Sequence, residues 1–70
     1  MEQIAIRGET IRLGQLLKLA GVVDSGAEAR ALLAEHPALV NGEPENRRGR
    51  QLHDGDTVAV EGRQLRLSSA

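Results

Sequence analysis

The sequence contains no cysteine and no aromatic residue, and each absence excludes a class of protein. Without cysteine, neither a disulfide framework nor a thiolate metal site can form, so a reducing compartment is the expected setting. Without Phe, Tyr and Trp, the hydrophobic core has to be aliphatic. The same absence excludes the aromatic platforms on which many single-strand binders stack bases. Any contact with nucleic acid would then use arginines, hydroxyls and backbone N–H groups.

Long hydrophobic runs are also missing. No stretch approaches the ~20 apolar residues of a membrane span, and MEQIAIRGET lacks the basic start and apolar run of a signal peptide. With 70 residues, the chain forms one domain at most, residues 1–70. Such a short domain buries only ~60% of the surface that its unfolded chain exposes. We therefore expect a small, soluble, cytoplasmic domain of modest stability, with no membrane partner.

Positive charge is unevenly distributed along a chain whose formal net charge is −1. Residues 1–45 hold four basic and seven acidic groups, a balance of −3, whereas residues 46–70 hold five basic and three acidic groups, a balance of +2. The net charge argues against a nucleic-acid partner, because nucleic-acid binders are usually strongly basic. The local charge favours one, since screening confines the influence of each charge to about 10 Å.

The first half of the chain predicts a strand followed by two helices. QIAIR alternates and predicts the strand. From Thr10, apolar residues recur at helical spacing as far as Gly21, which suits the position after a helix end. Gly14 is expected to weaken this helix by ~1 kcal/mol relative to Ala. Ser25 and Glu28 have the spacing of a reciprocal capping box at the start of the second helix, which should end before Pro37.

The second half of the chain predicts short strands. Asn41 and Gly42 suit a type I′ hairpin turn, and Pro44 predicts that the strand after this turn is short or lies at a sheet edge. After an arginine-rich loop, HDGD predicts a turn, and TVAVE and QLRL predict two more strands. The order is β-α-α-β-β-loop-β-β. The predicted fold class is α+β, with two short helices packed on one face of a small, mainly antiparallel sheet.

The loop ENRRGR is the strongest candidate for a binding site. It places three arginines within four positions: Arg47, Arg48 and Arg50. Planar guanidinium groups suit phosphate oxygens because they donate two parallel hydrogen bonds. Three neighbouring like charges repel one another unless an anion joins them, so we expect a bound polyanion to fill this space. The alternative is a solubilising loop whose arginines pair with Glu43 and Glu45.

Three residues of the helices are further candidates. Arg12 and Arg30 flank the apolar stripes of their helices and could frame a face shared with the arginine loop. Alternatively, they are solvated or paired with Asp24 or Glu28. Ser25 begins the second helix, where free N–H groups and the helix dipole could receive a phosphate. Simple capping of the helix is the alternative, and both roles can coexist.

Residues suited to catalysis or metal binding are few. The two histidines, His36 and His53, have neither cysteines nor paired carboxylates at ligand spacing. A nucleophile elbow and a glycine-rich phosphate loop are both absent from the sequence. We therefore expect a protein that is not an enzyme, with no metal site and no cofactor.

Five segments, taken together and in this order, resemble one known family. They are IRLGQLLKLAG, SGAEARALL, LVNGE, ENRRGRQL and DGDTVAV. Over about residues 10–61, the chain is similar to the S-four-like RNA-binding domain. It most resembles the compact stand-alone bacterial subgroup of YbcJ/YaaA type, which adds a leading strand and a trailing hairpin.

This resemblance implies an αL-like fold that binds structured RNA, ribosomal or transfer RNA, with its two-helix face and the adjoining loop. We expect ribosomal RNA or a ribosomal particle as the partner, and we expect the protein to be a monomer. The implied RNA-binding residues are Arg12, Ser25, Arg30, Asn41, Arg47, Arg48 and Arg50. Gly14 stands where the family usually has aspartate, and Gly26 where many relatives have arginine. Because of these departures, we expect the arginine loop to contribute more to RNA binding than the helix face.

Two alternatives come from other classes of protein. Sulfur carriers of the ubiquitin-like β-grasp type have a similar length, and they share the VNGE and DGD segments. Their chemistry needs a C-terminal Gly-Gly, whereas this sequence ends in RLSSA, so we expect no carrier function. The second alternative is a protein-binding adaptor on the ribosome or on another enzyme. An interaction insensitive to salt would favour that alternative.

Overall fold

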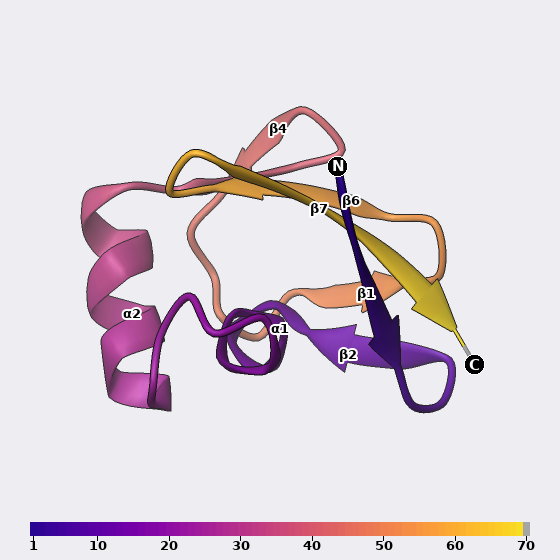
Figure 1. Cartoon of the computed structure of the whole chain (residues 1–70). Helices are drawn as coiled ribbons and strands as arrows, with labels where there is room; N and C mark the ends of the chain where they lie inside the picture. Colours follow the sequence, from indigo (N-terminus) through magenta and orange to yellow (C-terminus); the bar gives the residue numbers. More distant parts are fainter. Residues whose placement is uncertain (70) are drawn as a thin grey trace.

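Aliphatic side chains from both helices and both sheets form a single core. The computed structural model describes residues 1–69, which Figure 1 traces from the N-terminus to the last strand. In this view α1 lies below β6 and β7, α2 lies at the left, and β2 and β5 lie beside α1. The largest fully buried side chains are Ile6, Leu13, Leu16, Leu17, Leu33, Leu52, Leu65 and Leu67. The core is aliphatic, as the missing aromatics predicted.

Residues 1–69 form two helices and seven strands. The helices are α1 (Leu13–Leu19) and α2 (Gly26–Glu35). The strands are β1 (Glu2–Ile6), β2 (Thr10–Arg12), β3 (Ala38–Val40), β4 (Glu43–Glu45), β5 (Gln51–His53), β6 (Thr57–Val60) and β7 (Arg63–Ser69).

The larger sheet has the strand order β1-β7-β6-β3-β4. Only β1 and β7 pair in parallel, while the other neighbours are antiparallel. This arrangement confirms the predicted fold class, two helices on a mainly antiparallel sheet. It also places β4 at an edge, as Pro44 predicted, because a proline cannot donate a hydrogen bond to a further strand. Strands β2 and β5 form a separate antiparallel pair.

The predicted start of the first helix was wrong. Thr10–Arg12 is strand β2, and the helix begins only at Leu13. β2 pairs with β5, and Ile11 lies opposite Leu52, so a partner 41 positions away in the sequence outweighs the local helical spacing. Periodicity within one segment carries no information about such a distant partner. The end of the helix agrees with the prediction, because Gly21 adopts a positive φ of 75°.

The hairpin between β3 and β4 confirms the predicted type of turn. Asn41 and Gly42 both have positive φ, at 51° and 84°, and Val40 pairs with Glu43 across the two-residue loop. This register places Glu45 opposite the fully buried Ala38. Glu45 therefore lies on the core-facing side of the sheet. Among residues 1–69, no helix is long and apolar enough to cross a membrane.

Truncation of a core leucine should lower the free energy of unfolding much more than truncation of an exposed leucine. Leu65→Ala empties a fully buried site on β7, and we expect it to lower the free energy of unfolding by ~2–5 kcal/mol. Leu39→Ala on β3 is the matched control, because Leu39 is 42% exposed, and its effect should stay within ~0.5 kcal/mol. Urea denaturation followed by circular dichroism measures both. Equal losses would contradict this description of the core.

Candidate functional site

The arginine-rich loop after β4 is fastened to the start of helix α1 by its backbone. The N–H of Leu13 donates to the carbonyl of Arg50, and the N–H of Gly14 donates to the carbonyl of Arg48, both at 2.8 Å. These N–H groups belong to the first turn of the helix, where no carbonyl within the helix can accept from them. The loop therefore caps α1, and the helix fixes the path of the loop.

Glu45 joins two of the three arginines. Its carboxylate accepts hydrogen bonds from Nε of Arg47 at 3.0 Å and from Nη2 of Arg47 at 3.1 Å. It also accepts from Nη1 of Arg50 at 2.9 Å and from the backbone N–H of Arg47 at 3.1 Å. Glu45 is 7% exposed. A buried carboxylate is costly unless it is paired and hydrogen-bonded, so Glu45 and the two arginines depend on one another.

The pKa of Glu45 reports the same pairing. Hydrogen bonds from the Arg47 side chain and then its backbone, followed by Arg50, lower the pKa of Glu45 from 4.5 to about 2. Burial acts in the opposite direction but is outweighed. The carboxylate therefore stays charged far below neutral pH, and it stabilises the folded state only while it is charged.

Arg48 bridges the beginnings of the two helices. Its Nη1 donates to the carbonyl of Gly26 in the first turn of α2, at 3.2 Å. Its aliphatic stem packs against Gly14, where an added Cβ would lie 3.1 Å from the Cβ of Arg48. Gly14, expected to be only a weak point of its helix, is therefore the residue that lets the loop approach α1. None of the ion pairs among residues 1–69 involves Arg48.

The expectation that a polyanion alone fills the space between the arginines was wrong. Glu45, which the alternative reading named as a partner, occupies that space for Arg47 and Arg50. Positive charge still exceeds negative charge, because one carboxylate pairs with two guanidinium groups, while the third, of Arg48, donates to the carbonyl of Gly26. A guanidinium carries five N–H donors. Arg47 uses two of them on Glu45 and Arg50 uses one, so both retain donors for a further acceptor.

Arg12, Ser25 and Arg30 lie close to this junction. Arg12 immediately precedes α1, and its backbone N–H donates to Oε1 of Gln15 at 3.2 Å. Ser25 caps α2 by accepting from the N–H of Glu28 at 3.1 Å. Arg30 lies one helical turn after Gly26, on the same face of the helix. No ion pair within residues 1–69 joins Arg12 or Arg30 to an acidic residue.

The predicted capping box of α2 is only half formed. Ser25 accepts from Glu28 as expected, but the Glu28 carboxylate accepts from the N–H of Asp24 at 3.1 Å and not from Ser25. Because the backbone of Ser25 is extended, the N–H of Asp24 lies within hydrogen-bonding distance of the Glu28 carboxylate. Glu28 therefore ties the linker between the helices to α2.

The structure separates Asn41 from the other candidates. Asn41 lies at the β3–β4 turn, at the opposite end of β4 from the arginine loop. Its amide nitrogen donates to Asp56 at 3.1 Å, and its amide oxygen accepts from the N–H of Thr57 at 2.9 Å. The Asn41 side chain thus joins two turns of the sheet.

The histidines and acidic residues were the remaining candidates for a metal or catalytic site. Residues 1–69 contain no cluster of three His, Asp or Glu side chains placed to hold a metal ion. His53 is the last residue of β5, and its Nδ1 is 3.7 Å from the Asp56 carboxylate. His36 follows α2 at its C-terminal end.

Comparison with known proteins gives two findings. A family model described as "S4 domain" matches residues 4–68. A protein of Bacillus subtilis (strain 168), described as "Probable ribosome maturation protein RlbA", is 58% identical over 59 residues. The aligned region covers 84% of this chain and 83% of that relative.

Alanine at position 14 should destabilise the protein although it favours a helix. The added methyl group meets the Arg48 stem and carbonyl, which hydrogen bonds hold in place. Overpacking costs ~1–3 kcal/mol, which exceeds the ~1 kcal/mol gained in helix propensity. We expect Gly14→Ala to lower the melting temperature. Gly49→Ala is the control, because nothing lies within 4 Å of its added Cβ, and it should have no such effect. A melting temperature raised by Gly14→Ala would contradict the tight contact.

The pairing of Glu45 should appear as a dependence of stability on pH. Because its pKa is lowered to about 2 when folded, its contribution is complete above about pH 4.5 and is lost as the pH falls toward 2. Glu45→Gln should flatten the fall of the unfolding free energy over this range. Glu43→Gln, an exposed neighbour on the same strand, should leave it unchanged. Urea titrations at several pH values measure both, and identical curves for the two variants would refute the pairing.

Proposed function

Because this chain belongs to the S4 domain family, we propose that it is a non-enzymatic module that binds structured RNA through the junction of its arginine loop and two helices. The family model matches residues 4–68, nearly the whole chain. The observation that carries the proposal is the position of Arg48. This arginine, outside every ion pair among residues 1–69, is held where both helices begin, between two arginines that Glu45 orients.

Fixed arginines are well suited to phosphate. Binding normally costs side-chain entropy, because each mobile side chain has to be ordered at the interface. Here, hydrogen bonds to Glu45 and Gly26 already restrict the three guanidinium groups. Their remaining N–H groups can donate to phosphate oxygens in the charge-assisted geometry that arginine favours. Glu45 then acts as a support for the site, and the phosphates contact the outer edges of the arginines.

The helix residues extend this surface. Arg12 and Arg30 supply charge beside α1 and α2, and Ser25 keeps the first turn of α2 in place. We place Asn41 at the margin of the RNA-binding surface, because its amide is hydrogen-bonded to Asp56 and Thr57 and lies away from the arginine loop. Phosphate contacts of this kind position an RNA but carry little sequence information.

Ribosomal RNA or a ribosomal particle is the partner that we propose. The support is the name of the relative from Bacillus subtilis, a probable ribosome maturation protein, which aligns over most of both chains. Membership of the S4 family leaves the β-grasp carrier alternative without support. The adaptor alternative differs in its measurable consequence, because binding through protein contacts would depend less on salt than binding through phosphates.

Loss of one loop arginine should change the salt dependence of RNA binding. If about four phosphates are neutralised, log K falls against log[salt] with a slope on the order of −3 to −4. Arg48→Gln should reduce the magnitude of this slope by nearly 1, measured by fluorescence anisotropy with a labelled RNA hairpin. Arg66→Ala is the control, because Arg66 is exposed on β7 between the buried Leu65 and Leu67 and therefore faces away from the helices.

Two outcomes would contradict the proposal. A slope unchanged by Arg48→Gln would show that the loop does not contact phosphate. Crosslinking in cells that recovers proteins but no RNA would support the adaptor alternative. Crosslinked RNA that maps to ribosomal sequences is the result expected for the proposed partner.

A further inference from the structure

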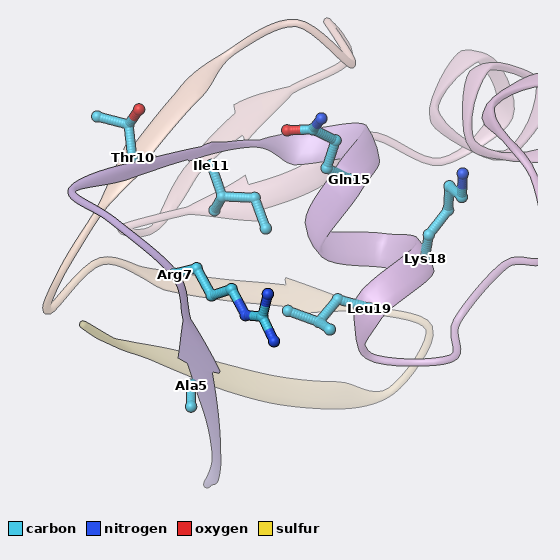
Figure 2. Close-up of a pocket in the computed structure, with 7 residues that line it drawn as sticks. All are labelled: Ala5, Arg7, Thr10, Ile11, Gln15, Lys18 and Leu19. Carbon is cyan, nitrogen blue, oxygen red and sulfur yellow. The ribbon is translucent and has the colours of Figure 1, made fainter. Parts of the chain in front are cut away.

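A second surface lies in a groove between β1, β2 and α1. Its volume is about 590 Å³, within the ~300–1,000 Å³ typical of small-molecule sites. Figure 2 shows Ile11 and Leu19 pointing into this space, with the Arg7 guanidinium reaching toward Leu19 from the end of β1. Lys18 and Gln15 line the rim on α1.

The lining of this groove combines an exposed leucine with two cations that form no ion pair, and the packing of the fold requires neither feature. Leu19 is 56% exposed, although it ends a helix whose other leucines are buried. Arg7 and Lys18 belong to no ion pair among residues 1–69. An exposed aliphatic surface between two unpaired cations suits a ligand that is flat and apolar on one side and anionic on the other.

The groove shares helix α1 with the proposed RNA surface. Lys18 lies one helical turn after Gly14, against which Arg48 packs, so both cations lie along the same side of α1. At the other end of the rim, Gln15 accepts from the backbone N–H of Arg12. An RNA held by the arginine loop would thus have its chain directed along α1 toward the groove.

We propose that the groove between β1 and α1 holds one unpaired nucleotide of the bound RNA, so this inference rests on the proposed function. The base lies on Leu19 and Ile11 under the planar Arg7 guanidinium, which replaces the missing aromatic platform. Lys18 and Arg7 contact the flanking phosphates, and the free N–H₂ group of Gln15 donates to the edge of the base. The site would give this chain a preference for RNA that carries an unstacked base near a helix.

Two RNA probes separate this inference from the proposed function. One is a blunt hairpin, and the other is the same hairpin with a short single-stranded uridine tail. We expect the wild-type protein to bind the tailed hairpin about fivefold more tightly, the low end of the range for one stacked base. Leu19→Ser and Arg7→Gln should reduce this difference to less than about twofold, and Leu19→Ser should leave binding of the blunt hairpin unchanged. Arg48→Gln should weaken binding of both hairpins.

The outcomes distinguish the two claims. Equal binding of both hairpins by the wild-type protein, or a preference that survives in both groove variants, would overturn the groove inference alone. Failure to bind either hairpin would overturn the proposed function as well.

Methyl NMR locates the contact independently of the arginine loop. Uridine monophosphate should shift the methyl signals of Leu19 and Ile11 in a saturable manner, while inorganic phosphate should not. Leu39, exposed on the sheet, is the internal control and should not shift. Shifts of Leu19 with an acidic, leucine-containing peptide but not with the nucleotide would overturn the inference in favour of a protein partner.

Discussion

The carboxylate of Glu45 is the group around which the candidate site is organised. The β3–β4 register buries it opposite Ala38 on an edge strand, where an unpaired charge would be costly. Arg47 and Arg50 fold back over it, and their backbone path carries Arg48 to the beginnings of both helices. A negative charge thereby determines the geometry of a positive surface. A chain with a net charge of −1 can present such a surface because its arginines are gathered at one place.

Backbone contacts make this arrangement part of the fold itself. The carbonyls of Arg48 and Arg50 cap α1, and β5, which begins directly after Arg50, pairs with β2 just before the helix. The loop is therefore held at both of its ends. In a domain of this size, stability is small, so a change that loosens the loop also affects the fold. Binding surface and structural support cannot be varied independently here.

Local patterns in the sequence predicted much of the fold. The Asn41–Gly42 turn, the edge position of Pro44 and the end of α1 before Gly21 depend on intrinsic backbone preferences, so short segments reveal them. The β2 strand and the parallel pairing of β1 with β7 depend on partners distant in sequence, and no local period reports them. The same limit applies to the site. The arginines were visible in the sequence, but the burial of Glu45 and the close approach at Gly14 follow only from how the elements pack.

Binding of RNA by Glu45→Gln tests the central claim most directly, because charge and geometry predict opposite results. The substitution removes a negative charge beside Arg47 and Arg50, so long-range electrostatics alone would strengthen binding. If Glu45 instead orients the guanidinium groups, the variant should bind an RNA hairpin more weakly than the wild-type protein at the same salt concentration, while Glu43→Gln should not. Tighter binding by Glu45→Gln would contradict this account and would mean that Glu45 merely neutralises part of the arginine charge.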